Sequence, residues 1–258
     1  MILAIDIGNT NIVVGCIDEK RTIFIERLST IKNKMEIEYA LDIKGIFEIH
    51  DVDVRKVEGA IISSVVPQIT GIIGDACEKV INKKAMVVGP GIKTGLNIMI
   101  DNPGQLGSDL VADAVAGVAE YKAPMIIFDL GTATTASVVN EKGTYIGGFI
   151  IPGMYTSLNA LTANASQLQG ISLDAPSRLI GKNTIECMKS GMIYGTAASL
   201  DGIIARVEEE LGQPVTAIVT GGLAEKVLPF CKKEVIWDDD LLLKGLRIIY
   251  NKNKEHKM

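Results

Sequence analysis

Short apolar runs alternate with amphipathic stretches along the whole chain. The runs at 2–5 and 12–17 are rich in β-branched residues and are separated by a turn-forming Asp-Ile-Gly-Asn-Thr-Asn segment, so they predict a hairpin. Apolar side chains recur at helical spacing over 34–50, and a strand is expected at 59–63. The rest of the first half predicts an α/β arrangement, with helices at 68–82 and 108–121 and a strand at 85–88.

The same pattern starts again in the second half. An apolar run at 125–128 ends in Asp129-Leu-Gly-Thr-Ala-Thr, and Asp129 stands 123 residues after Asp6, nearly half the chain. This repetition predicts a duplicated α/β lobe, which we divide into domains 1–118 and 119–258. The remaining expected elements are strands at 136–139, 145–151 and 215–219 and helices at 153–169, 184–211, 224–231 and 241–250.

Composition narrows the class of protein. A chain of 258 residues with 47% apolar and 22% charged residues is an ordinary globular sequence, long enough for one large or two modest domains. A net charge of −5 without a basic cluster argues against nucleic acid as a partner. The uncharged stretch 143–173 contains proline, asparagine and glutamine, so we interpret it as buried protein surface and expect no membrane span.

Cysteine and histidine usage limits the chemistry. The four cysteines are far apart and form no C-x-x-C pair, which is typical of reduced thiols in a cytoplasmic protein. His50 and His256 are the only histidines, so the sequence argues against a Ser-His-Asp site, a Cys-His site and a histidine-ligated metal site. Chemistry is therefore expected from carboxylates, hydroxyls, glycine backbone and bound ions.

The first turn has the residues that a phosphate site needs. Gly8 allows backbone N–H groups to approach an anion, and Asn9, Thr10 and Asn11 add amide and hydroxyl groups. Asp6, at the end of the preceding strand, is placed to hold hydrated Mg²⁺. One such turn alone is more often a plain hairpin, but the second copy favours two lobes that face one nucleotide.

Together these segments resemble the type III pantothenate kinases, which belong to the superfamily of actin-like ATPases, sugar kinases and heat-shock ATPases. The resemblance runs from residue 2 to about residue 250 and rests on a set of short motifs. They are Asp6-Ile-Gly-Asn-Thr-Asn, Ser63-Ser-Val-Val-Pro, Gly89-Pro-Gly-Ile-Lys-Thr-Gly-Leu-Asn, Asn102-Pro, Gly107-Ser-Asp, Asp129-Leu-Gly-Thr-Ala-Thr-Thr, Gly147-Gly, Pro152-Gly, Gly181-Lys-Asn-Thr and Thr220-Gly-Gly.

The resemblance implies two duplicated ribonuclease-H-like lobes with a cleft between them. It also implies phosphorylation of pantothenate by ATP, the first step of coenzyme A biosynthesis, with Mg²⁺ and K⁺ or NH₄⁺ in a homodimer. By matching position, Asp109 is the expected general base and Asp129 the expected monovalent-cation ligand. The expected ATP-binding residues are Asp6, Ile7, Gly8, Asn9, Thr10, Asn11, Ile12, Val13 and Thr132, and the expected substrate-binding residues are Ile100, Gly107, Ser108, Asp109, Leu110 and Thr184.

Several plainer interpretations stay open. Asp109 also suits the first turn of a helix, where the macrodipole favours a carboxylate. The stretch 143–173 fits a dimer surface or a buried core equally well. Gly221-Gly222 after a predicted strand suits a close approach of adenine or ribose, or a plain turn.

The sequence departs from the family pattern at two positions of the acceptor site. Leu110 replaces the arginine that helps to hold pantothenate, and Ile100 replaces an aromatic residue. Losing a charge-assisted hydrogen bond of about 1.5–3 kcal/mol should weaken substrate binding roughly 10- to 100-fold. Three alternatives to an ordinary member follow: a kinase for a related small hydroxylated acid, a weak or inactive regulatory protein, or an ATPase or sugar kinase of the same superfamily.

Overall fold

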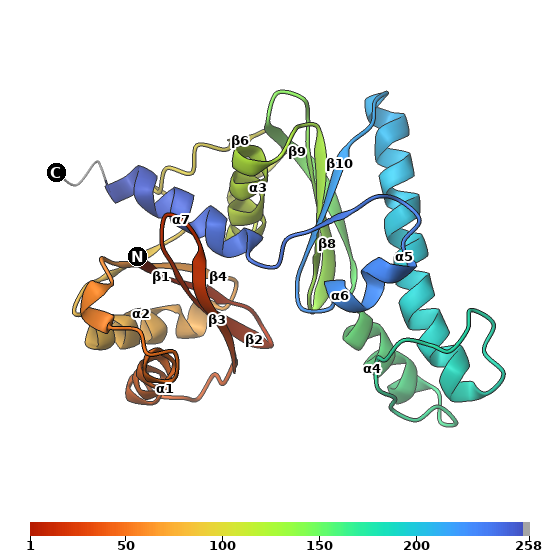
Figure 1. The fold of residues 1–258 in the computed structure, drawn as a ribbon, viewed down its shortest axis with the longest axis horizontal. Coiled ribbons are helices and arrows are strands. Elements are labelled where there is room, and N and C mark those ends of the chain that lie inside the picture. Colours follow the sequence, from red (N-terminus) through yellow and green to blue (C-terminus); the bar gives the residue numbers. More distant parts are fainter. Residues whose placement is uncertain (255–258) are drawn as a thin grey trace. The chain divides into compact units, whose positions relative to one another are not determined.

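The structure is a computed structural model that describes residues 1–254 (Figure 1). Within these residues the chain forms two compact units. Unit 1 contains residues 1–96, 101–119 and 240–254, and unit 2 contains residues 97–100 and 120–239.

Unit 1 is built on a five-stranded sheet with the order β3-β2-β1-β4-β5. The first three strands are antiparallel, whereas β4 and β5 run parallel to β1. The β1–β2 hairpin confirms the first prediction from the sequence. The strands are β1 (Ile2–Ile7), β2 (Asn11–Ile17), β3 (Thr22–Ser29), β4 (Ala60–Ser64) and β5 (Ala85–Val87).

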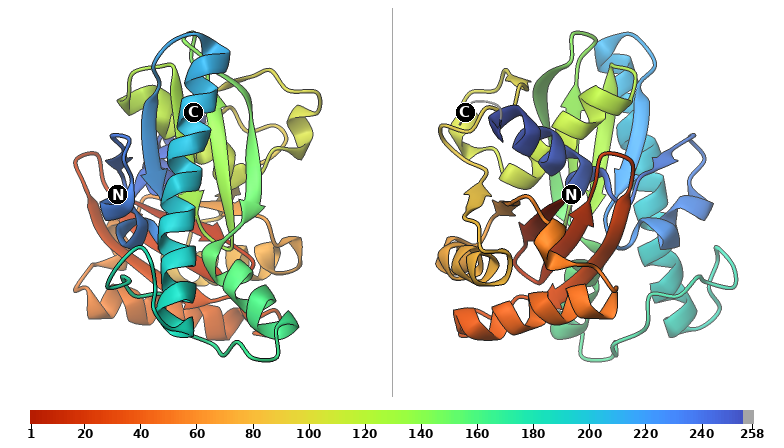
Figure 2. Two further views of the ribbon diagram at one scale, coloured as in Figure 1. Left: turned by 90° about the vertical axis from the view of Figure 1, so that its right-hand side faces the viewer. Right: turned by 60° about the vertical axis from the view of Figure 1, so that its left-hand side comes forward.

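Helices cover both faces of this sheet (Figures 1 and 2). The core on one face joins Leu3, Ile5 and Ile7 to buried residues of α1 and α2. On the other face α7 packs against β1, β2 and β4, and its Leu243 occupies the space beside Gly15. The helices of unit 1 are α1 (Glu36–Ile49), α2 (Pro67–Ile81), α3 (Ser108–Glu120) and α7 (Leu241–Lys254), with 3₁₀ turns at Val54–Lys56 and Pro103–Gln105.

Unit 2 has a six-stranded sheet with the order β11-β10-β7-β8-β9-β6. Again three antiparallel strands are followed by two parallel ones, because β10 and β11 run parallel to β7. The order β9-β8-β7-β10-β11 therefore repeats the order β3-β2-β1-β4-β5 of unit 1. The strands are β6 (Asn97–Ile98), β7 (Met125–Leu130), β8 (Ala133–Val139), β9 (Thr144–Pro152), β10 (Thr216–Thr220) and β11 (Ile236–Trp237).

One continuous apolar cluster holds the helices of unit 2 to its sheet. Phe128 and Val219 of the sheet join Leu200 and Ile204 of the long helix α5 in this cluster. Figure 2 shows α5 running along the sheet as a single straight helix. The helices are α4 (Met154–Asn164), α5 (Thr184–Leu211) and α6 (Ala224–Val227), followed by a 3₁₀ turn at Leu228–Phe230.

The elements predicted from periodicity are present, with differences at four places. The strands β3, β6 and β11 were not expected, and α4 ends at Asn164 rather than at residue 169. The predicted division at 118/119 also differs from the two units, because α7 packs on the sheet of unit 1. Among the described residues, no helix combines the length and the apolar character that crossing a membrane requires.

Candidate active site

Asp6 stands beside a serine at the carboxyl end of the unit 1 sheet. Strands β1 and β4 are parallel, and Asp6 is in register with Ser63, which is completely buried. Since side chains alternate along a strand and Ile5 and Ile7 face α1 and α2, Asp6 and Ser63 point to the opposite face. A carboxylate and a hydroxyl therefore share one end of the sheet.

The turn after β1 is hydrogen-bonded to Thr30, the residue that directly follows β3. The Thr30 backbone N–H donates to the Thr10 carbonyl at 3.0 Å, and the Thr30 hydroxyl donates to the Gly8 carbonyl at 2.7 Å. Gly8 N–H itself donates to Asn11 O at 3.0 Å. The turn is thereby held in shape while the side chains of Asn9, Thr10 and Asn11 are exposed. An anion can reach amide and hydroxyl groups there.

Ser108 joins the start of α3 to the end of β4. Its Oγ lies 3.0 Å from Ser63 Oγ and accepts a hydrogen bond from Ser64 N–H at 3.0 Å. Ser63 is the register neighbour of Asp6, and Ser108 directly precedes Asp109. The structure thus brings together the end of β1 and the first turn of α3, which are about one hundred residues apart in the sequence.

The Asp109 carboxylate is held at the start of its own helix. Its Oδ1 accepts a hydrogen bond from Leu110 N–H at 2.9 Å, and the carboxylate lies over Gly107. A Cβ at residue 107 would overlap Asp109 Oδ1. The absence of a side chain at Gly107 therefore allows Asp109 to take this position.

Unit 2 contains a second turn with the same construction. Asp129 occupies the next-to-last position of β7, as Asp6 does in β1, and is in register with Thr220, which is 5% exposed. The Thr132 carbonyl accepts hydrogen bonds from Gly153 N–H at 3.1 Å and from Thr156 Oγ1 at 2.6 Å. Each unit therefore pairs an aspartate with a buried hydroxyl beside a fixed turn.

Gly221 closes over this second turn. Its φ of +94° lies in the left-handed region, and a Cβ there would come 2.6 Å from Leu130 N and would overlap Asp129 Oδ1. Only glycine fits between β10 and the end of β7. This packing was not part of the sequence prediction, although a Gly-Gly pair directly after a strand is a signal for a close backbone approach.

The other predicted site residues are divided between unit 1 and unit 2. Ile7 and Ile12 are buried in the core of unit 1, so only their backbone can take part in binding, and Val13 is the register neighbour of Asp6. Leu110 is half-buried in α3. In unit 2, Ile100 follows β6 and is half-buried, and Thr184 is the exposed first residue of α5.

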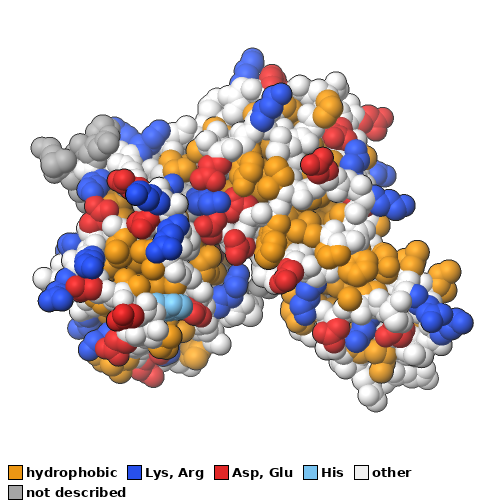
Figure 3. Space-filling model, viewed as in Figure 1, with side chains coloured by type: hydrophobic (Ala, Val, Ile, Leu, Met, Phe, Trp, Pro, Cys, Tyr) orange, Lys and Arg blue, Asp and Glu red, His pale blue; other side chains and the backbone are white. Residues whose placement is uncertain are grey.

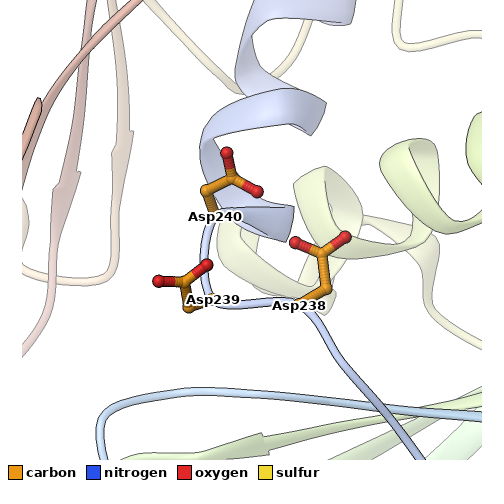
Figure 4. Close-up of side chains that lie close together, drawn as sticks. All are labelled: Asp238, Asp239 and Asp240. Atoms are coloured by element: carbon orange, nitrogen blue, oxygen red, sulfur yellow. The ribbon is translucent and has the colours of Figure 1, made fainter. Parts of the chain in front are cut away.

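Three consecutive aspartates also lie close together where the chain enters α7 (Figure 4). Their carboxylate oxygens are within 4.8 Å of one another. Asp238 accepts a hydrogen bond from the Tyr121 hydroxyl at 2.6 Å, and Asp240 pairs with Lys244 at 2.8 Å and with the Thr22 hydroxyl. These partners show that the two carboxylates anchor the chain locally.

A pocket of about 620 Å³ in unit 1 lies away from the predicted site. It is lined by Met1, Ile2 and Ile17, at the end of the hairpin opposite to the Gly8 turn. Glu58 at its wall is already paired with Lys254. The pocket therefore contains none of the predicted catalytic or nucleotide-binding residues.

Comparison with known proteins decides the family. The sequence profile of the family described as type III pantothenate kinase matches residues 2–206. A type III pantothenate kinase from Exiguobacterium sp. is 44% identical over 255 residues, which is 99% of this chain and 100% of that protein. The chain belongs to the type III pantothenate kinase family. It is therefore a kinase that transfers phosphate to an alcohol group.

Solved structures agree on the fold of this type III pantothenate kinase. Component A of (R)-2-hydroxyglutaryl-CoA dehydratase from Acidaminococcus fermentans has a TM-score of 0.58 at 13% identity, covering 99% of this chain and 98% of that chain. The ROK hexokinase from Thermus thermophilus has a TM-score of 0.50 at 15% identity, with 98% and 99% covered. These similarities support the predicted actin-like fold.

Sequence reasoning missed the hydroxyl contacts of the type III pantothenate kinase site. Ser63 was recognised only as part of a motif, Ser108 was expected to bind substrate but not to contact Ser63, and Thr220 was recognised only as the start of a Gly-Gly turn. Their role depends on strand register and on a contact between segments 45 residues apart, to which no local pattern points.

Proposed function

We propose that this protein phosphorylates the primary hydroxyl of pantothenate with ATP and so forms 4′-phosphopantothenate, the first step of coenzyme A biosynthesis. One observation carries the proposal beyond family membership. Ser108 connects the candidate base Asp109 to Ser63, the register neighbour of Asp6 in the first phosphate turn. Phosphoryl transfer depends mainly on such positioning and on charge neutralisation.

Asp109 is the proposed general base. In the reaction its carboxylate accepts the proton of the acceptor hydroxyl while that oxygen forms a bond to the γ-phosphorus and ADP departs. The hydrogen bond from Leu110 N–H to Oδ1 fixes the orientation of the carboxylate. Oδ2 is then the oxygen that is directed to the substrate.

The first turn is the proposed site for the ATP phosphates. The backbone and side chains of residues 8–11 supply hydrogen-bond donors, and Asp6 supplies the carboxylate for hydrated Mg²⁺. A single carboxylate beside a hydroxyl suits Mg²⁺, which keeps several of its waters. When bound, the ion neutralises negative charge on the phosphates.

The second turn has the donors for a monovalent cation. Asp129, with Thr220 beside it in register, offers one carboxylate and one hydroxyl oxygen, and by its match to the family motif it is the proposed ligand of K⁺ or NH₄⁺. Thr132 is the proposed second phosphate contact. Its carbonyl is held by Gly153 and Thr156, so the position of its backbone is fixed.

The proposed acceptor site contains residues 107–110 with Ile100 and Thr184. The segment 97–120 contains four carboxylates and no lysine or arginine. The carboxylate of pantothenate would therefore meet the start of α3 without a basic side chain from this segment. We infer from this that pantothenate binds weakly.

We also propose a homodimer formed through unit 2. Apolar side chains are exposed along β9 and around the start of α4, at Phe149 (41%), Ile150 (76%) and Tyr155 (48%). Figure 3 shows hydrophobic side chains at the surface over α4 and the neighbouring end of α5. An uncharged apolar surface of this kind is suited to a second copy of the chain.

The dimer has a direct test. Ile150→Glu places a charge in the middle of the exposed part of β9, so the variant should sediment as a monomer where the unchanged protein sediments as a dimer. Ile37→Glu on α1, 54% exposed in unit 1, is the matched control and should leave the dimer intact. A monomeric unchanged protein would refute the proposal.

The cytoplasm is the proposed location. All four cysteines are free thiols, and Cys16 and Cys77 are buried. Such thiols suit a reducing compartment. Fractionation of cells of the source organism, with the protein followed by antibody, tests the assignment.

The activity is tested by measuring ADP release from purified protein with Mg²⁺ and K⁺ over a wide range of pantothenate concentration. We expect saturation with a high KM for pantothenate. Asp109→Asn should lower kcat about 10²- to 10⁴-fold while ATP still binds, since only the base is lost. Ser199→Ala, at an exposed position of α5, is the control for handling and purity. Full activity in Asp109→Asn would refute the mechanism.

A further inference from the structure

The carboxyl ends of three neighbouring strands in unit 2 form one edge with an uneven distribution of side chains. Strands β7, β10 and β11 are adjacent and parallel, so their ends meet at the same edge. The turn containing Thr132 follows β7, and the two glycines 221 and 222 follow β10. Trp237 ends β11. Ligands of open α/β sheets bind outside such carboxyl ends.

Trp237 is the large aromatic group at this edge. It is the sole tryptophan of the chain and is 49% exposed. Trp237 is in register with Val219, which packs against α6. The side chain of Trp237 therefore lies on the face of the sheet that α6 covers. Between the β7 turn and Trp237 the edge is formed by Gly221 and Gly222, which present only backbone.

The spacing along this edge suits a nucleotide. Neighbouring strands lie about 4.8 Å apart, so β11 lies roughly 10 Å from β7. That is comparable with the separation between the phosphates of a nucleotide and its base. A nucleotide with its phosphates at the Thr132 turn can pass over the two glycines and bring its base to the indole.

We propose that Trp237 stacks on the adenine base of ATP. The inference rests on the proposed function, because it takes the Thr132 turn as a phosphate contact. A base presents an apolar face to an aromatic ring, and such stacking contributes to binding without hydrogen bonds to the base edge. Trp237 therefore contributes to affinity for ATP and takes no part in the transfer step.

The experiment uses the complete protein and the fluorescence of its sole tryptophan. MgATP should quench or shift the emission, whereas tripolyphosphate, which carries phosphates without a base, should leave it unchanged. Calorimetry measures binding of both ligands independently of the indole. Trp237→Ala should raise the Kd and KM for ATP about tenfold, with kcat at saturating ATP and the Kd for tripolyphosphate within about twofold. Trp237→Phe retains a ring and should stay within about threefold of the unchanged protein.

Ile236→Ala is the matched control. Ile236 is the other residue of β11, is 39% exposed and points to the opposite face, so its loss weakens the strand without removing the ring. Unchanged ATP affinity in Ile236→Ala supports stacking, and equal losses in both variants refute it. ATP binding that leaves the emission unchanged, or that is unaffected in Trp237→Ala, refutes stacking while the kinase assignment stands. Failure of the unchanged protein to bind ATP or turn over refutes both.

Discussion

The Asp109 carboxylate lies over Gly107, in the space that any side chain at residue 107 would occupy. Gly107→Ala would therefore push Asp109 Oδ1 away from the N–H of Leu110. Because the base must be within hydrogen-bond reach of the acceptor hydroxyl, we expect kcat to fall about tenfold or more, with a smaller change in KM for ATP. Steady-state kinetics with both substrates varied measures the separate effects on kcat and on KM.

Gly104→Ala is the matched control for that prediction. Gly104 lies three residues before Gly107, and nothing is within 4 Å of the position of its Cβ. Its substitution should leave kcat within about twofold, since an exposed change without a clash is usually small. Equal losses in the two variants would show that the segment tolerates no alanine, and the specific role of Gly107 would be wrong.

Gly221→Ala should destabilise unit 2. The substitution combines a φ of +94° with overlap against Asp129 and the backbone of Leu130, so the second turn must shift. We expect a loss of about 2–4 kcal/mol in the free energy of unfolding, measured by urea denaturation. Gly212→Ala, with a φ of +68° and open space around its Cβ, should cost only about 1 kcal/mol. Similar losses for both would contradict a role for the overlap.

Leu110→Arg should strengthen pantothenate binding. The substitution adds a guanidinium to a segment that carries only acidic charges, directly after the candidate base. A charge-assisted hydrogen bond of about 1.5–3 kcal/mol corresponds to a KM for pantothenate roughly 10- to 100-fold lower. Leu110→Met, which keeps the volume without the charge, should leave KM unchanged. A KM that stays constant in Leu110→Arg would show that the pocket compensates elsewhere.

Three of the four thiols should be unreactive in the folded protein. Burial raises the pKa of Cys77 to about 12 and the pKa of Cys16 and Cys231 to about 11. The thiolate is the reactive form, so at pH 8 a disulfide reagent should modify at most one thiol per chain, the exposed Cys187. Counting released thionitrobenzoate before and after denaturation checks this, and Cys187→Ser should remove the native reaction. Modification of two thiols without unfolding would contradict it.

Predictions from the sequence succeeded where the local pattern was strong. The hairpin around Gly8 and the helix Thr184–Leu211 have clear periodicity, and both are present. The sequence did not predict β11, because two residues are too few to show a period. It did not predict β3 either, because the polar residues Glu26 and Arg27 interrupt the alternation of that strand. The predicted helix after Gly153 was too long, because residues 165–169 contain no glycine or proline that would have indicated its end at Asn164.

By itself the sequence determined the two aspartate turns, the candidate base Asp109 and the membership of a kinase family. These depend on short motifs, whose local conformation follows from glycine, turn residues and strand periodicity within a few positions. The tertiary structure alone decided that Ser63 meets Ser108, that α7 packs on the first sheet, and that Trp237 stands at the carboxyl edge of the second. Such pairings depend on packing and strand register between distant segments, which local periodicity does not encode.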